Sequence, residues 1–397
     1  MPNTLQIADW PKGEGAEALV TALGADNMRW VGGAVRDTLL GLPVKDIDCA
    51  TTLEPDEVAE RCNKAGIAIV PTGIEHGTNT AIVSLSDGTK EVFEVTTLRR
   101  DVATDGRRAT VAFAKEWHED AARRDFTINA LYAHPETLEI SDYFGGLDDL
   151  TARRVRFIGD ARARIAEDYL RILRYYRFQA RFGAELDPVA EEACAELSAT
   201  LKGLSRERVA DELLRLLTLP DPGETVARMF ERGVLPVILP ESCAPHVRAL
   251  HKLIECEAEQ SIAPDPIRRL AALLPPSPDV AEGIAARLRL SKAQRARLVS
   301  AAERQGTDAD APQALAYQLT VPFAVDRLLL LGHDARPLEG WEPPIFPLKG
   351  GNIVERGVAA GPQVARFLQT VEKSWIAEGF PDASRVAQIL DSVLKEG

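Results

Sequence analysis

The sequence predicts an α+β multidomain fold, in which a head with a mixed sheet and helices is followed by an all-α remainder. Short runs that alternate polar and apolar residues, separated by glycine-containing turns, fill the first 140 residues. From about Ile158 the pattern becomes helical nearly throughout, with Leu, Ala, Arg and Glu dominating. A chain of 397 residues also exceeds the usual size of one domain, so several modules are expected.

The predicted head begins with a strand that enters two glycines. Residues 28–31 form this strand, and residues 34–40 a helix closed by Gly41. A polar segment over 100–108 comes later, and the apolar run that follows Arg124 is helix-like. The other predicted elements of the head are a strand over 46–50, a helix over 55–65, and strands over 67–70, 78–85 and 91–97.

Proline-containing breaks divide the helical remainder. They lie at 187–188, 219–223, 274–278 and 340–347, which suits boundaries between helical subdomains. We therefore expect four domains: a catalytic head over 1–140, a neck over 141–218, a body over 219–276 and a tail over 277–397.

Composition limits the function classes. No apolar run approaches the roughly 20 residues that cross a bilayer, and the first residues lack a secretion pattern, so no membrane association is expected. Five scattered cysteines indicate a reducing compartment, and we predict a cytoplasmic protein. The net charge of −13 argues against a nucleic-acid partner, yet nine arginines and only three acids lie between Arg153 and Arg181, so a polyanion can bind locally.

A glycine turn followed by two aspartates is the most specific local feature. Gly32 and Gly33 between a strand and a helix let the backbone approach a triphosphate, and Arg36 can add a charged contact. Strand alternation places Asp46 and Asp48 on one face, about 6–7 Å apart. Two such carboxylates repel each other unless a cation lies between them, and Mg²⁺ prefers oxygen ligands and substrate phosphates. Taken alone, the glycine pair is more often an ordinary turn, and the aspartate pair is more often solvent-facing. The spacing between the two features favours a metal site.

Two further segments suggest nucleotide contacts. Arg124 can reach a phosphate or ribose, and Asp125 can accept a hydrogen bond from a 2′-hydroxyl; the alternative is an exposed pair that caps a helix. Asp168 and Arg171, three residues apart on a predicted helix, can hold each other side by side. Together they match the amine and ring nitrogen that cytosine and adenine share, whereas uracil and guanine mismatch both. The alternative is a surface salt bridge worth under about 1 kcal/mol.

The stretch GGAVRDTLLGLPVKDIDCAT, over residues 32–51, resembles the signature of the class II tRNA nucleotidyltransferases and bacterial poly(A) polymerases, within the polymerase-β nucleotidyltransferase superfamily. The segments RRDFTINA (123–130), EDYLR (167–171) and LSRERV (204–209) resemble further motifs of this family. The resemblance implies that Gly33 and Arg36 contact the incoming nucleotide. It makes Asp46, Asp48 and Glu94 catalytic, with the two aspartates as metal ligands, although Glu94 is equally well an outward-pointing strand residue.

The same resemblance implies a pocket in which the protein itself acts as template. Its predicted nucleotide-binding residues are Gly33, Arg36, Arg124, Asp125, Asp168, Arg171, Arg174 and Arg177. It further implies a hinge over 142–150 and a flexible loop around Asp105, Gly106 and Arg107 for the switch from C to A addition. The implied substrates are CTP, ATP and the 3′ end and acceptor arm of tRNA, with Mg²⁺ as cofactor, a tRNA-binding tail and no protein partner.

Several rival functions share parts of this pattern. A poly(A) polymerase has the same head and neck motifs, but the acidic chain without a long basic extension favours tRNA. An enzyme that adds only CC or only A is a second rival, and the segment 99–113 argues against CC-only addition. An RNA-binding protein on an inactive polymerase scaffold has no use for clustered carboxylates such as Asp46 and Asp48. A dinucleotide-binding Rossmann domain is disfavoured because GGAVRD lacks the GxGxxG spacing.

Overall fold

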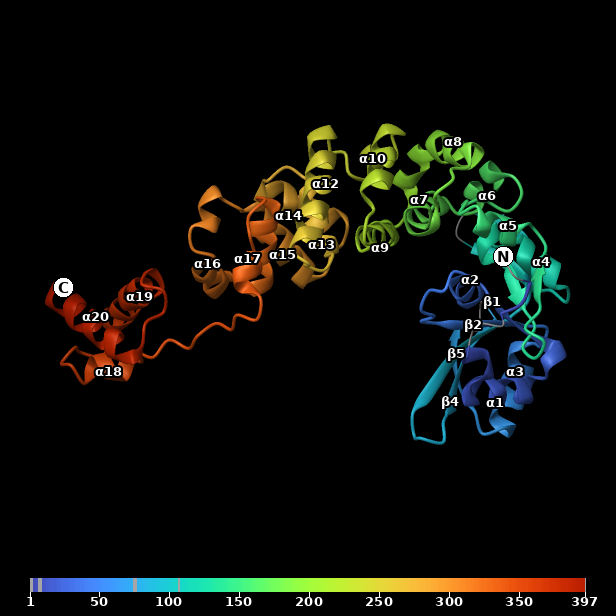
Figure 1. Cartoon of the computed structure of the whole chain (residues 1–397), viewed down its shortest axis with the longest axis horizontal. Helices are drawn as coiled ribbons and strands as arrows, with labels where there is room; N and C mark the ends of the chain where they lie inside the picture. Colours follow the sequence, from blue (N-terminus) through green and yellow to red (C-terminus); the bar gives the residue numbers. More distant parts are fainter. Residues whose placement is uncertain (1–2, 6–8, 74–76, 106–107, 397) are drawn as a thin grey trace. The chain divides into compact units, whose positions relative to one another are not determined.

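A computed structural model describes residues 3–5, 9–73, 77–105 and 108–396, which form two compact units, 1–239 and 240–397. The first unit combines a mixed sheet with helices, and the second is helical, so the predicted α+β architecture is confirmed (Figure 1). Within the described ranges, every helix is too short or too polar to span a lipid bilayer.

The main sheet has seven strands in the order β3-β4-β5-β2-β1-β8-β9. All neighbours pair antiparallel except β2 and β5, which are parallel, so the sheet is mixed. The strands are β1 (Met28–Val31), β2 (Ile47–Thr51), β3 (Ala68–Gly73), β4 (Thr78–Ser84), β5 (Lys90–Thr97), β8 (Leu131–Ala133) and β9 (Ile140–Asp142). The five predicted strands of the head are thus confirmed to within a few residues.

Three helices fix the sheet, and α1 and α3 also pack against each other. α1 (Glu14–Leu23) contacts β4, α3 (Pro55–Lys64) contacts β3 and β4, and α2 (Gly33–Leu39) contacts β1, β2 and β8. The fully buried Trp30 and Phe93 lie in the core, where their rings are 6.0 Å apart. Alternation along β5 sends Phe93 inward and leaves Glu94 exposed, so polar residues gather on the opposite face.

One expectation for the head needs correction. The run after Arg124 is not helical: a single 3-10 turn over Thr127–Asn129 leads into β8, whose three residues are all buried. A strand buried on both faces has no polar alternation, so its sequence resembles that of a buried helix. In the polar segment over 100–108, the described residues belong to two paired strands, β6 (Arg99–Asp105) and β7 (Arg108–Phe113). The predicted loop residues Gly106 and Arg107 lie outside the described residues, so the flexible loop stays a prediction.

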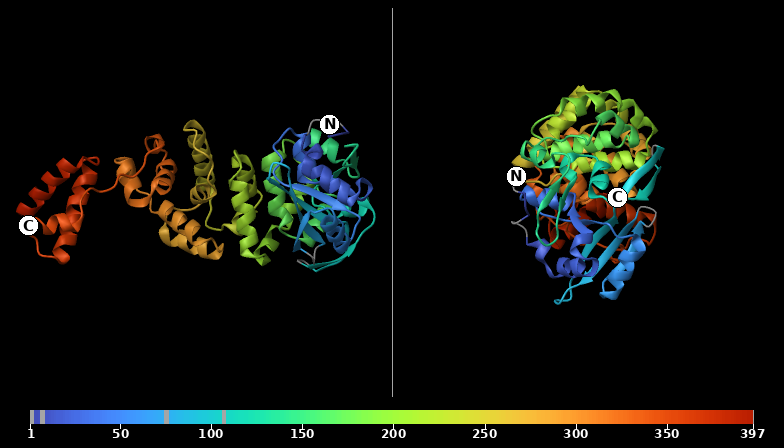
Figure 2. Two further views of the ribbon diagram at one scale, coloured as in Figure 1. Left: turned by 90° about the horizontal axis from the view of Figure 1, so that it is seen from below. Right: turned by 90° about the vertical axis from the view of Figure 1, so that its right-hand side faces the viewer.

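Helices follow the strands in unit 1 and are the main elements of unit 2 (Figure 2). Asp160, Asp187 and Ser205 cap three of them through side-chain hydrogen bonds to backbone amides. Unit 1 contains α4 (Trp117–Ala122), α5 (Gly146–Thr151), α6 (Ala161–Glu167), α7 (Arg171–Phe182), α8 (Pro188–Glu196), α9 (Arg206–Leu217), α10 (Gly223–Glu231) and α11 (Leu235–Ile238). Unit 2 contains α12 (Ala244–Glu259), α13 (Pro266–Ala272), α14 (Pro278–Arg287), α15 (Lys292–Ala302), α16 (Pro312–Leu319), α17 (Val321–Leu330), α18 (Gly350–Val354), α19 (Pro362–Ala377) and α20 (Ala383–Glu396).

Candidate active site

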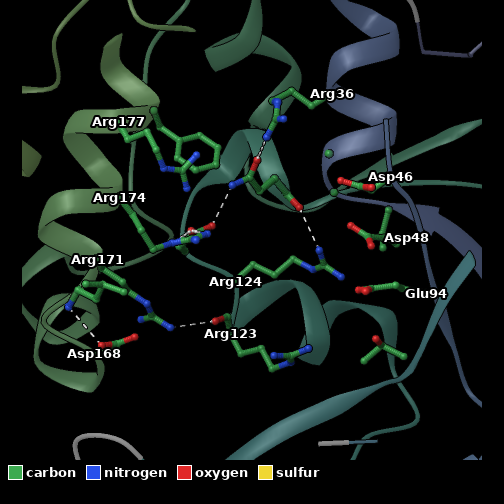
Figure 3. Close-up of a pocket in the computed structure, with 18 of the residues that line it drawn as sticks. Arg36, Asp46, Asp48, Glu94, Arg123, Arg124, Asp168, Arg171, Arg174 and Arg177 are labelled. Atoms are coloured by element: carbon green, nitrogen blue, oxygen red, sulfur yellow. Dashed lines mark hydrogen bonds and ion pairs between the residues drawn. The ribbon is translucent and has the colours of Figure 1, made fainter. Parts of the chain in front are cut away.

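A cavity of about 740 Å³ in unit 1 brings together all eleven residues that the sequence singled out (Figure 3). They come from α2, from β2 and the residue before it, from β5, from the segment before β8, from the end of α6, and from α7. The eleven are Gly33, Arg36, Asp46, Asp48, Glu94, Arg124, Asp125, Asp168, Arg171, Arg174 and Arg177. Residues up to 144 positions apart in sequence, such as Asp37 and Arg181, make contact beside this cavity.

The lining is basic, although the chain is acidic. Five carboxylates line the cavity: Asp46, Asp48, Glu94, Asp125 and Asp168. Ten arginines line it as well: Arg36, Arg99, Arg123, Arg124, Arg171, Arg174, Arg177, Arg181, Arg208 and Arg215. The formal charge of the lining is therefore positive, and the local field suits a polyanion such as a nucleoside triphosphate.

Three acidic side chains form one wall. Asp48 on β2 is the register partner of Glu94 on β5, so both lie on the same face of the sheet, and exposed Asp46 directly precedes β2. Burial, with repulsion from Glu94, raises the pKa of Asp48 to about 6, although Arg124 opposes the shift. A pKa above the ordinary value means that the protein surroundings disfavour the Asp48 anion, so a nearby cation would stabilise it.

The acid wall fits a divalent cation that shares its ligands with a substrate. The described residues contain no group of three or more His, Cys, Asp or Glu side chains arranged to hold a metal ion by themselves. Mg²⁺ commonly takes only one or two carboxylates and completes its shell with water and phosphate oxygens. Asp46 and Asp48 supply such a pair, and the role of Glu94 as a third acid stays a prediction.

The glycine turn brings the backbone against Arg124 and Asp48. Gly32 has φ +66°, and a Cβ there would lie 3.2 Å from Nη1 of Arg124 and 3.8 Å from Oδ2 of Asp48. The turn therefore needs glycine both for its left-handed backbone and for space. Arg36, on α2, donates to Asp37 at 2.8 Å and to Asn129, and its guanidinium lies 4.2 Å from the ring centre of Phe182.

A chain of ion pairs joins the segment before β8 to α7 and α9. Arg174 donates from Nε to Asp125 at 2.9 Å and lies 3.6 Å from Glu212, which pairs with Arg177 at 2.6 Å. Burial would raise the pKa of Asp125, but Arg174 and a hydrogen bond from Asn129 outweigh it and lower the pKa to about 2. Asp125 is therefore ionised and fixed in place; its contact with a ribose stays a prediction.

Asp168 and Arg171 are not paired with each other, and this corrects the sequence expectation. Asp168 ends α6 in an extended conformation, and Arg171 is the first residue of α7, so they do not share one helix. Asp168 accepts from Nη2 of Arg208 at 2.6 Å, whereas Arg171 pairs with Glu167 and donates to the carbonyl of Arg164. Both still line the cavity (Figure 3), but each has its own ion-pair partner.

Several residues that line or support the cavity were not predicted. Arg181 pairs with Asp37 at 3.1 Å and continues the arginine stripe along α7, so helical spacing alone could have identified it. Asn129 donates to Asp125 four residues earlier, but this segment is not an α-helix, so the helical spacing rule does not account for the contact. Arg208 and Glu212 lie on α9, and no local pattern in the sequence links them to Asp168 and Arg177.

Family models match two parts of the chain. Residues 28–156 match the poly A polymerase head domain, and residues 183–244 match a model described as the probable RNA and SrmB-binding site of polymerase A. The first match covers the sheet with its acid wall, and the second covers α9 with Arg208 and Glu212.

Relatives match from about half to most of the chain. The mouse (Mus musculus) CCA tRNA nucleotidyltransferase 1, mitochondrial, is 35% identical over 389 residues, covering 92% of this chain and 87% of the relative. A CCA-adding enzyme of Streptococcus pneumoniae is 43% identical over 204 residues, about half of each chain. The Bacillus stearothermophilus CCA-adding enzyme in complex with CTP shares the fold, with a TM-score of 0.73 and 23% identity over 96% of this chain and 98% of that one. The predicted resemblance is confirmed, and the chain belongs to the CCA tRNA nucleotidyltransferase family.

Proposed function

We propose that this protein adds C, C and A to the 3′ end of tRNA, from CTP and ATP, by Mg²⁺-dependent nucleotidyl transfer. The single observation that carries the proposal is the cavity in which an acid wall, Asp46, Asp48 and Glu94, faces a wall of arginines. This arrangement accommodates a metal ion and a triphosphate at once, in a chain that aligns with a CCA tRNA nucleotidyltransferase over 92% of its length.

The reaction joins the terminal 3′-hydroxyl of the RNA to the α-phosphate of the nucleotide. The new P–O bond forms as the bond to the β-phosphate breaks, and pyrophosphate leaves while the hydroxyl proton goes to solvent. Asp46 and Asp48 would hold the Mg²⁺, which supplies charge stabilisation for the reacting phosphate when bound. Arg174 and Arg177 would contact phosphates, and Arg124 with Asp125 would contact the ribose.

Base selection would use Asp168 and Arg171 as a protein template. The Asp168 carboxylate accepts from the exocyclic amine of cytosine or adenine, and Arg171 donates to the neighbouring ring nitrogen. Because Asp168 is held by Arg208 and Arg171 by Glu167, the base must compete with these two partners. Uracil and guanine present a carbonyl and an N–H at these positions, so their contacts would not compensate for the loss of these ion pairs.

The remaining domain roles follow from the same proposal. We assign catalysis to residues 1–140, nucleotide selection to 141–218, a body to 219–276 and tRNA binding to the tail over 277–397. The compartment remains a prediction: the five cysteines are free thiols, which suits a reducing cytoplasm, while the mouse relative is named as mitochondrial.

Primer extension with defined tRNAs tests the proposal. The substrates are tRNAs that end at the discriminator base, at C and at CC, each incubated with Mg²⁺ and one nucleoside triphosphate at a time. The proposal predicts C, C and A in order, followed by arrest. Long A-tails would instead support a poly(A) polymerase, extension of the CC-ending substrate alone an A-adding enzyme, and absence of extension an RNA-binding protein on an inactive scaffold.

A further inference from the structure

Asp120 is a buried carboxylate that lies behind the cavity without lining it. Its residue is 1% exposed on α4, and it accepts from Oη of Tyr132 at 2.6 Å and from Nε of Arg123 at 2.7 Å. It also pairs with Nη2 of Arg124 at 3.3 Å and accepts from the backbone amide of Arg99 at 3.3 Å. Three of these four partners, Arg99, Arg123 and Arg124, line the cavity, so one carboxylate contacts several of its arginines.

Asp120 is ionised at neutral pH. Burial would raise its pKa, but Arg124, Arg123 and the Tyr132 hydrogen bond outweigh burial and lower the pKa to about 2. Arg124 is held on the same side by Tyr132, whose hydroxyl accepts from its Nε at 2.8 Å and whose ring centre lies 5.1 Å from its guanidinium. The anchor for Arg124 is thus a charged carboxylate and an aromatic side chain.

Arg124 also faces two carboxylates of the acid wall, Asp48 and Glu94. Nη1 of Arg124 and Oδ2 of Asp48 lie 3.2 Å and 3.8 Å from the same point, the position that a Cβ on Gly32 would occupy. Figure 3 shows the Arg124 guanidinium extended toward Asp48 and Glu94. If Asp120 lost its charge, Arg124 would lose this ion pair and would be left facing Asp48 and Glu94. An ion pair between Arg124 and Asp48 would occupy a carboxylate that the metal site needs.

We propose that Asp120 is a positioning residue that holds Arg124 away from Asp48 and so keeps that carboxylate free for a divalent cation. The inference deepens the proposed function and rests on it for the role of Asp48. It explains why a buried acid binds two adjacent arginines behind the cavity: the acid competes with the metal-binding aspartate for Arg124. Removal of a residue that orients a metal site typically costs about 10- to 100-fold in metal affinity.

Mn²⁺ binding to the metal-free protein, measured from the EPR signal of the free ion without nucleotide or tRNA, tests this directly. Asp120→Asn should weaken Mn²⁺ binding about tenfold or more, while Asp120→Glu should restore much of the affinity. Glu191→Gln is the matched control, because Glu191 is also a buried acid with arginine partners but does not line the cavity. It should leave Mn²⁺ binding unchanged; a loss equal to that of Asp120→Asn would overturn the inference.

A double-substitution cycle with Arg124 separates positioning from a general structural effect. In an Arg124→Gln background the guanidinium proposed to compete for Asp48 is absent, so adding Asp120→Asn should produce no further loss of Mn²⁺ affinity. A double variant as weak as Asp120→Asn alone would overturn the inference. Should Asp120→Asn fail to fold by circular dichroism, Tyr132→Phe replaces it in the cycle, with a smaller loss in the same direction expected.

The outcome is separable from that of the proposed function. Stepwise C, C and A addition by the unsubstituted protein supports the proposed function whatever the Mn²⁺ cycle gives. If the Asp120 and Arg124 variants bind Mn²⁺ as predicted but the unsubstituted protein fails to extend tRNA, the positioning role of Asp120 is supported and the proposed function is rejected.

Discussion

The Asp168 carboxylate lies 2.6 Å from Nη2 of Arg208, 40 residues further along the chain. Arg171, which the sequence suggested as its partner, pairs with Glu167 instead. The two groups proposed to recognise the base are therefore held separately, each by an oppositely charged neighbour. The positions of Arg208 and Glu167 consequently enter the selection of the nucleotide, because they determine what the base has to displace.

Arg208→Gln should alter base selection more than it alters stability. Loss of the guanidinium frees Asp168 to move, so we expect the preference for CTP over UTP, measured as the ratio of kcat/KM values, to fall at least several-fold. Arg206→Gln, on the same helix, is the control, because its guanidinium donates to the carbonyl of Lys202 and does not line the cavity. An unchanged CTP/UTP ratio in Arg208→Gln would rule out this role.

Gly32→Ala tests the close approach of Arg124 to the glycine turn. Gly32 and Gly41 both have φ +66°, but only a Cβ at Gly32 would meet atoms within 4 Å. Each alanine should cost about 1 kcal/mol of unfolding free energy through backbone strain. Gly32→Ala should in addition reduce CMP addition, whereas Gly41→Ala should not. Equal activity of the two variants in single-turnover assays would contradict the contact.

Glu212→Gln should destabilise the arginine wall. Glu212 is 4% exposed and pairs with Arg177 and Arg174, so loss of its charge leaves two arginines with a poorer partner. We expect a loss of about 2–4 kcal/mol in unfolding free energy and a higher KM for CTP. Asp211→Asn is the adjacent control: its exposed pair with Arg215 should contribute under about 1 kcal/mol. Urea denaturation measures the unfolding free energy of both variants. Equal losses in Glu212→Gln and Asp211→Asn would contradict the importance of burial at Glu212.

Asp48 should make the metal-free protein less stable as the pH rises. Its pKa is about 6 in the folded state, above the ordinary value of 3.8, so between these values the folded state binds more protons than the unfolded state. Stability contributed by this group is present below about pH 4 and is lost as the pH rises through 6. Asp48→Asn should thus be more stable than the unsubstituted protein at pH 7–8 by on the order of 1 kcal/mol, and the difference should disappear near pH 4. A stability difference that grew toward acid pH would contradict this sign.

Local patterns predicted much of the head, because alternation and turn residues act over a few positions. The strand over 28–31, the turn at Gly32 and the strand that follows Asp46 were identified in this way, and the structure confirms them. The parallel register of Asp48 with Glu94 could not be predicted from the residues, since parallel strands pair through a long connection.

Partner choice among charged side chains was the least predictable feature. Spacing favoured a pair between Asp168 and Arg171, but the helix ends between them, and α9 supplies Arg208. Asp120 carried no motif at all, since its importance comes from burial behind the cavity and from the partners that burial brings together. Such contacts depend on tertiary packing, which local spacing does not encode.

The most direct test of the metal role of the acid pair is the rate of CMP addition by Asp46→Ala, with tRNA binding measured on the same preparation. Loss of a metal ligand should lower the single-turnover rate by at least about 100-fold and leave the Kd for tRNA nearly unchanged. Asp87→Ala, in an exposed turn, should match the unsubstituted protein in both respects. Retained addition by Asp46→Ala, or an equal loss of addition and tRNA binding, would contradict the account.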